Sequence, residues 1–254
     1  MSDYLIDEQE LKTISKLFNQ RVIKNTEIVT PFTLKQDTLF HIALNKRDKF
    51  FPNISKRAGA SEDNTLTRVH VSPTLLGCWF GYATGANLAL YNKPSTKKET
   101  TASNSPKLPS IYKGGFYIHE IPFRCALKPN KTLVYDSDLT DELWLVTYNE
   151  YTKNFPAKVI GTLFINKLSY FPVVNKMPEC VASICVNIEK GKSIKFSLNN
   201  EHQGINKNCP EVLKEGYWIF DVNETTIEVS NLKAISEKQF NEYKLKTAAM
   251  LEFE

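Results

Sequence analysis

The chain has 254 residues, of which 42% are hydrophobic, 11% aromatic and 24% charged, and its net charge is +4 at pH 7. A chain of this length and composition can bury a large core, which excludes general disorder and a small scaffold that depends on disulfides. The modest positive charge permits an anionic partner such as nucleic acid but does not require one.

The N-terminal stretch is polar and carries apolar side chains at helical spacing, which predicts an amphipathic helix over residues 7–21 and not a secretory signal. No run reaches the roughly 18 apolar residues of a membrane span. The five cysteines are scattered without a CxxC pair, which favours reduced thiols. We therefore expect a cytoplasmic protein with no membrane partner.

Two early segments predict strands that carry histidines. Residues 38–44 form an apolar run with His41 near its centre, and residues 67–71 alternate as a strand does and contain His70. From Leu75 onward the apolar spacing becomes helical, and Ser72 with Pro73 stands at the junction. The sequence thus predicts a strand, a cap and a helix in succession.

Glycines recur at steps of four on this helix, at Gly77, Gly81 and Gly85. Such spacing clears one helix face for close approach by a backbone or a ligand. We favour tight packing of the helix against a sheet. Between the two strands we expect a long loop anchored by Phe50 and Phe51.

The remaining elements predict an α+β protein in two parts. A polar excursion at residues 92–110 precedes strands at residues 114–123, 131–148 and 158–168, with an acidic corner inside the second of these. Short strands follow at residues 181–188, 193–198, 217–222 and 226–229, and then a helix over residues 236–251 capped by Ser236. We expect a first domain over residues 1–168 and a smaller β-rich extension over residues 169–254.

Common enzyme signatures are absent from the sequence. It contains no Walker loop, no dinucleotide-binding glycine motif, no G-x-S-x-G elbow and no H-E-x-x-H. Its four histidines and five cysteines have no paired ligand spacing, so we expect no metal site.

Four features stand in a characteristic order: a histidine in an early strand, the strand-to-helix unit VHVSPTLLGCW, the strand FYIHEI and the acidic corner YDSDLTDELW. In this order the chain resembles the ADP-ribosyltransferase fold, and within it the small rifampin-modifying transferases. The resemblance covers residues 38–166, in order and character more than in identity. It implies a mixed or antiparallel sheet core with flanking helices, and ADP-ribosyl transfer from NAD.

The resemblance assigns roles to particular residues. His41 matches the histidine that holds a hydroxyl of the nicotinamide ribose. His70 falls where the family has a tyrosine that stacks on nicotinamide, which is a departure because imidazole is a smaller stacking surface. The acid falls at Asp136, Asp138 or Glu142. We prefer Glu142, since TDELW places it beside a bulky tryptophan that would fix its rotamer.

Further contacts with NAD are expected from the same resemblance. Trp79 or Tyr82 would wall the nicotinamide pocket together with His70. Independently of the resemblance, Arg57 follows the first strand and could approach the pyrophosphate as a planar fork, or simply be solvated in its loop. Breaking the bond between nicotinamide and ribose passes through an oxocarbenium-like state, so a carboxylate close to the sugar gains most in the transition state. This chemistry requires neither a metal nor a covalent nucleophile.

Each of these residues also has an interpretation that involves no contact with NAD. His41 can be a satisfied buried histidine, His70 and His119 can be cross-strand surface residues, and the acidic corner can be a solvated turn. The lysines at 93, 97, 98 and 107 could steer an anionic target or only keep their loop soluble.

Three functions therefore remain open. The first is ADP-ribosyl transfer to a macromolecular acceptor, or NAD hydrolysis, in a toxin, a defence factor or a viral modifier of host machinery. The second is a non-enzymatic phage structural or host-interaction protein that uses the same fold as a scaffold. The third is a nucleic-acid-binding module, which needs a continuous face of lysine and arginine that the linear sequence does not display. Convergence of His41, His70 and one acid on a single cleft would discriminate the first from the second.

Overall fold

The computed structural model describes residues 22, 24–54, 65–81, 115–134, 137–147, 154–171, 179–198, 209–223 and 226–252. The predicted helix over residues 7–21, the polar excursion at residues 92–110 and Gly85 lie outside these ranges. So do three of the predicted site residues, Arg57, Tyr82 and Asp136, and the side chain of Asp138.

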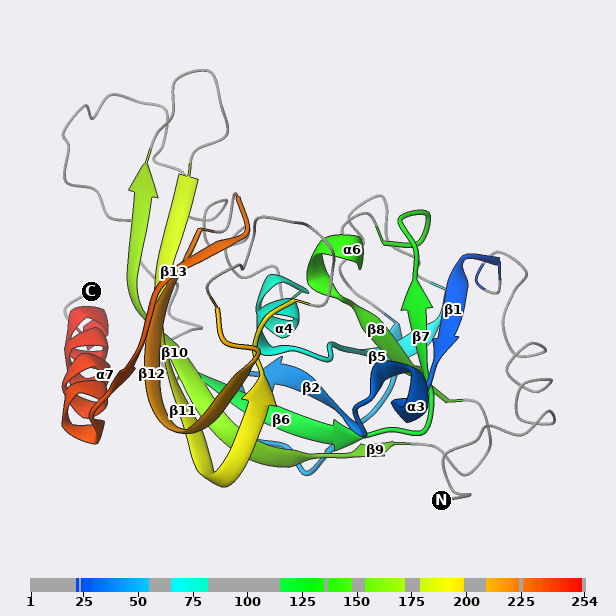
Figure 1. Cartoon of the computed structure of the whole chain (residues 1–254), viewed down its shortest axis with the longest axis horizontal. Coiled ribbons are helices and arrows are strands. Elements are labelled where there is room, and N and C mark those ends of the chain that lie inside the picture. Colours follow the sequence, from blue (N-terminus) through cyan, green and yellow to red (C-terminus); the bar gives the residue numbers. More distant parts are fainter. Residues whose placement is uncertain are drawn as a thin grey trace.

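The larger of the two main sheets has six antiparallel strands, in the order β13-β12-β11-β10-β6-β2. Their bounds are β2 (Thr38–Ala43), β6 (Phe116–Pro122), β10 (Lys158–Phe171), β11 (Glu179–Lys195), β12 (Val212–Asn223) and β13 (Glu228–Ile235). The long strands β10, β11 and β12 form one wall of the molecule (Figure 1).

The second sheet has five strands in the order β1-β7-β8-β5-β4. Their bounds are β1 (Thr26–Val29), β4 (Asn53–Ile54), β5 (Thr67–Val71), β7 (Ala126–Pro129) and β8 (Leu143–Val146). A small ladder joins β3 (Lys49–Phe50) to β9 (Phe155–Pro156). The described helices are α3 (Pro31–Leu34), α4 (Leu75–Gly81), α6 (Ser137–Thr140) and α7 (Glu237–Glu252). The fold is therefore α+β and mainly antiparallel.

Several local predictions are confirmed. The strand at residues 67–71 is β5, the strand at residues 38–44 is β2 except for its last residue, and Ser236 caps α7. That cap is reciprocal, because Ser236 Oγ accepts from Gln239 N at 3.2 Å while Ser236 N donates to Gln239 Oε1 at 3.0 Å.

Other elements differ from the prediction. The segments 181–188 and 193–198 belong mostly to one long strand, β11, which continues past an irregularity in its pairing after Ile188. Strand β7 was not predicted, and a short helix, α6, occupies part of the acidic corner. Phe50 is buried as expected, whereas Phe51 is 51% exposed, so its prediction as an anchor is wrong.

The start of α4 is capped differently from the expectation. Ser72 Oγ accepts from Thr74 N at 3.2 Å, as a hydroxyl at the junction should. The helix cap itself is Thr74, whose Oγ1 accepts from Gly77 N at 3.0 Å.

The predicted division at residue 168 falls inside β10. This strand pairs with β6 of the first part and with β11 of the predicted extension. One apolar cluster also joins Ile118 and Leu163 to Ile184 and Val186. The two parts therefore share one sheet and one core, and a division into folding units stays a prediction.

Helix α4 packs between the two sheets (Figure 1). Its side chains Leu75, Leu76 and Trp79 join the core of the six-stranded sheet. On the outer face of that sheet, Phe240 of α7 packs on Phe164. None of the helices that the structure describes has the length and apolar content needed to cross a bilayer.

The two sheets touch where β2 and β5 meet. Phe40 and Ser72 exchange backbone hydrogen bonds of 2.8 and 3.0 Å, and this is an isolated bridge. A continued antiparallel ladder would next bring Ile42 N to the carbonyl of His70. The strands separate instead, and this separation opens the space that the histidines border.

Gly77 is needed for packing at this point. A Cβ on Gly77 would overlap Ser72 Oγ and the carbonyl oxygen of Thr140 in α6, whereas a Cβ on Gly81 would lie 3.7 Å from the nearest atom of the described residues, Thr140 Cβ. The prediction of tight packing is confirmed for Gly77, although its partners are the Ser72 turn and α6 and not the face of a sheet.

We expect Gly77→Ala to lower the free energy of unfolding by about 2 kcal/mol or more, because backbone in α6 must move to relieve the overlap. Gly81→Ala is the matched control. Because alanine has a higher helix propensity than glycine, this substitution should leave the free energy of unfolding unchanged or raise it by up to about 1 kcal/mol. Urea denaturation measures both. Equal effects of the two substitutions would contradict the packing role of Gly77.

Candidate functional site

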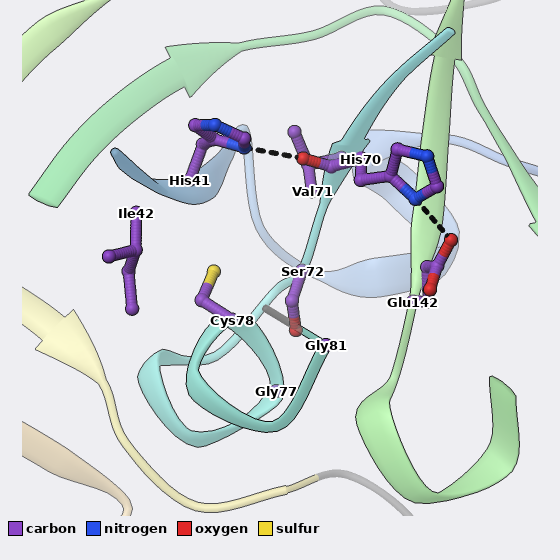
Figure 2. A pocket seen from close by; sticks show the side chains of 9 residues that line it. All are labelled: His41, Ile42, His70, Val71, Ser72, Gly77, Cys78, Gly81 and Glu142. Carbon is purple, nitrogen blue, oxygen red and sulfur yellow. Dashed lines mark hydrogen bonds and ion pairs between the residues drawn. The ribbon is translucent and has the colours of Figure 1, made fainter. Parts of the chain in front are cut away.

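A small cavity lies beside the junction of β2, β5 and α4 (Figure 2). Its volume is about 30 Å³, close to the space that one water molecule occupies in the liquid. It is lined by His41, Ile42, His70, Val71, Ser72, Gly77, Cys78, Gly81 and Glu142. The structure therefore brings together His41, His70 and Glu142, three predicted site residues that are far apart in the sequence.

His41 is held by the backbone of the neighbouring sheet. It shares one face of β2 with Leu39, which packs into the core between the sheets together with Phe50. The His41 ring lies edge-on to Phe50 with centroids 4.5 Å apart, and its Nδ1 is 2.6 Å from the carbonyl oxygen of His70. Since a carbonyl only accepts, Nδ1 carries the proton, and the neutral ring has Nε2 as its acceptor atom.

Glu142 is a carboxylate that is only 5% exposed, and it stands immediately before β8. Its Oε1 accepts from His70 Nδ1 at 2.6 Å and from the indole Nε1 of Trp144 at 2.6 Å. His70 and Trp144 are directly opposite each other in the β5–β8 ladder. The pairing of two strands therefore fixes both donors of the carboxylate.

Burial alone would raise the pKa of Glu142, because a charge is poorly solvated in the interior. Favourable interactions outweigh this effect of burial, so that the pKa of Glu142 lies below its ordinary value. They are the hydrogen bond and charge of His70, the hydrogen bond of Trp144 and the charge of Arg68. Arg68 is itself buried, with its guanidinium 4.0 Å from the centroid of the Trp144 ring. Glu142 is therefore an anion at neutral pH.

Both hydrogen bonds to Glu142 end on Oε1, so Oε2 is the atom that these donors leave to a ligand. His70 Nε2 is buried and has no hydrogen-bond partner among the described residues. Buried polar atoms are nearly always hydrogen-bonded in native proteins, so an atom of this kind marks a place for a ligand or a water molecule.

A much larger space adjoins the cavity, and we call it the main cleft. Its volume is about 1000 Å³, and it shares His41, Ile42 and His70 with the cavity. The other described residues that line it are Ala43, Leu44, Asn45, Arg47, Phe50, Phe51, Asn53, Ile54, Arg68 and Val69. Among these described residues there are two arginines and no carboxylate, so the main cleft is of ligand size and suits an anionic ligand.

Neither hydroxyl nor thiol at the cavity is set up as a nucleophile. Burial strongly raises the pKa of the Cys78 thiol, and its Sγ donates to the carbonyl oxygen of Phe40 at 3.0 Å. Ser72 Oγ lies 3.4 Å from the carbonyl oxygen of Thr140 and accepts from Thr74 N. Covalent catalysis needs an activated group, and these two are neutral and engaged in packing.

Two residues, Trp79 and His119, do not lie where the sequence predicted them. Trp79 is 1% exposed and packs edge-to-face on Phe116 in the core of the six-stranded sheet, so it does not line the cavity. His119 is opposite His41 in the β2–β6 ladder, but the expectation of a surface position is wrong, because it is 0% exposed. Burial lowers the pKa of His119, and its Nε2 accepts from Arg47 N at 3.1 Å.

Sequence reasoning missed Arg68, which belongs to the network around the carboxylate. A signal was present in the segment TRVHV, where Arg68 and His70 alternate with Val69 and Val71. Because side chains two apart share a face of a strand, Arg68 had to point to the same side as His70. Cys78 and Ser72 had no comparable signal as cavity residues.

No group of three or more potential metal ligands comes together within the part of the chain that the structure describes. The chain matches no protein-family model, no curated protein and no solved structure. The geometry of the site is therefore what indicates a function for this chain.

The lowered pKa of Glu142 predicts a pH dependence of stability. Its folded pKa lies below the ordinary 4.5, so its ionised form stabilises the fold above that pH, and the contribution is lost as the pH falls through the lower folded value. At pH 7 we expect Glu142→Gln to cost about 2 kcal/mol. The cost should shrink steadily when denaturation is repeated below pH 4.5.

Glu242→Gln is the control for this measurement, since Glu242 is exposed on α7. It should leave stability unchanged at every pH. A cost of Glu142→Gln that stays the same from neutral to acidic pH would contradict the assignment of a stabilised carboxylate.

Proposed function

We propose that the protein cleaves NAD between nicotinamide and ribose, and transfers the ADP-ribose to a macromolecular acceptor or to water. One observation carries the proposal: His41, His70 and the anion of Glu142 border one cavity, and the two histidines also line the main cleft. These are the residues that the resemblance to ADP-ribosyltransferases assigns to the ribose, the nicotinamide and the acid.

The roles follow from the atoms that the network leaves to a ligand. As the C1′–N bond breaks, nicotinamide leaves with the bonding electron pair and the ribose becomes cationic. Glu142 Oε2 is the anionic atom that would stabilise this cation, while His70 and Trp144 hold Oε1 in place. Water or an acceptor then adds to C1′ and gives its proton to the solvent.

His41 would orient the substrate. The carbonyl of His70 holds the ring through Nδ1 at the wall that the cavity and the main cleft share, where the ring could position a ribose hydroxyl. The family has a stacking tyrosine at the position of His70, and this difference is compatible with the proposed reaction. Through its hydrogen bond to Glu142, His70 would position the carboxylate more than stack on nicotinamide.

The sizes of the two spaces restrict where NAD can lie. The cavity of about 30 Å³ has no room for a sugar or a nicotinamide ring. The main cleft has room for a dinucleotide, and Arg47 and Arg68 on its wall suit a pyrophosphate. We therefore propose that NAD occupies the main cleft with its scissile bond at His41 and His70, and that Glu142, which lines the cavity and not the main cleft, acts on the ribose across the cavity.

The test is incubation with NAD that carries a label on its adenylate half, with nicotinamide release and label transfer both measured. We expect slow nicotinamide release by the parent. The rate for Glu142→Gln should be lower by a factor of about 100 or more, since the anion that stabilises the transition state is lost. Glu242→Gln on the surface of α7 is the matched control and should behave as the parent. The assay temperature is kept well below the unfolding midpoint of each variant.

Each outcome has a defined meaning. Equal release by the parent and by Glu142→Gln would reject Glu142 as the acid. No release by the parent, alone and with a cell extract that supplies acceptors, would reject NAD cleavage and favour the rival, a non-enzymatic phage structural or host-interaction protein that uses the fold as a scaffold.

A further inference from the structure

A second groove, which we call the basic channel, continues from the main cleft across the β3 region. Its volume is about 690 Å³, and the two spaces share Arg47 and Phe51. The basic channel is lined by Lys46, Arg47, Asp48, Lys49, Phe51, Ala157, Lys158, Val159 and Glu189. The surface therefore forms one continuous path from the histidines of the cavity to the start of β10.

Positive charge predominates along the basic channel. Four of the described side chains that line it are basic and two are acidic. Lys158 has Glu120 as its partner in the β10–β6 ladder, but the carboxylate of Glu120 is bound by Lys192 Nζ at 2.5 Å. The acid that is paired with Lys158 in the ladder is therefore already engaged by another lysine.

An exposed aromatic ring stands where the main cleft and the basic channel meet. Phe51 is 51% exposed, and Lys49 Nζ lies 5.6 Å from the centroid of its ring. Its neighbour Phe50 is buried, with Arg47 5.9 Å from its centroid. An open aromatic face beside cations offers stacking to a base and charge to a phosphate at the same place.

We propose that the basic channel binds a single-stranded nucleic acid, with its phosphates along the lysines and one base stacked on Phe51. Single strands are bound without sequence preference by this combination of a positive groove and an aromatic platform. An acidic peptide would use the charges but not the ring. This binding does not depend on NAD, so it holds or fails independently of the proposed reaction.

The test is fluorescence anisotropy with a fluorescein-labelled oligothymidylate of about 20 nucleotides, titrated with the full chain without NAD at several salt concentrations. The channel variant combines Lys46→Ala, Lys49→Ala and Lys158→Ala. The matched control carries the same change at three exposed lysines of β13 and α7, which are Lys233, Lys238 and Lys244. Both variants lose the same net charge, so only the position of the charge differs.

We expect the channel variant to bind about tenfold more weakly than the parent at low salt, and its salt slope to fall by about two, as the loss of three phosphate contacts predicts. The matched control should keep the parent's slope and lose less than about twofold in affinity. Phe51→Ala should weaken binding about fivefold without a change of slope, because stacking releases no counterions.

Three results would overturn the proposal. They are absence of binding by the parent at low salt, equal weakening in the channel variant and its control, and competition by polyglutamate as effective as that by unlabelled oligothymidylate. The last result would indicate an acidic protein as the partner.

Discussion

The candidate site depends on a carboxylate that is buried and still ionised. Removing a charge from water costs several kcal/mol unless donors compensate it. For Glu142 the donors are an imidazole and an indole, and a buried guanidinium adds its charge. His70 and Trp144 come from opposite positions of one strand pair, so the register of β5 and β8 determines whether the carboxylate can be tolerated there. A shift of one residue between the two strands would place His70 on the opposite face of the sheet from Glu142 and Trp144.

The second constraint is the way in which the two sheets separate. The single bridge between Phe40 and Ser72 holds β2 and β5 together, and beyond it the carbonyl of His70 is satisfied by the ring of His41 and not by a backbone amide. This side chain replaces a rung of a ladder, which explains why an apolar strand carries a histidine. The same separation leaves room beside Glu142, so one backbone feature both orients His41 and opens the cavity.

Local patterns of the sequence predicted much of the framework. Alternation predicted the bounds of β5, and Ser236 as the expected cap of an apolar-periodic segment predicted the start of α7. Longer-range features were less visible. The merging of two predicted strands into β11 depends on pairing with β10 and β12, and β7 is a short strand supported by β1. Adjacent residues of an extended segment point to opposite sides, which argues against burial of both Phe50 and Phe51, but only the tertiary structure decided that Phe51 is the exposed one.

The sequence by itself determined which side chains each strand presents, because the period of two in a strand and the helical period of α4 are local properties of the chain. It was the resemblance in the order of these elements, and not their periodicity, that indicated His41, His70 and Glu142 as candidates. Only the tertiary structure decided that these three border one cavity, that Trp79 belongs to the core and that Arg68 acts on the carboxylate. Distances between residues on different strands follow from sheet pairing and from the angle between sheets, and no local pattern of residues contains that information.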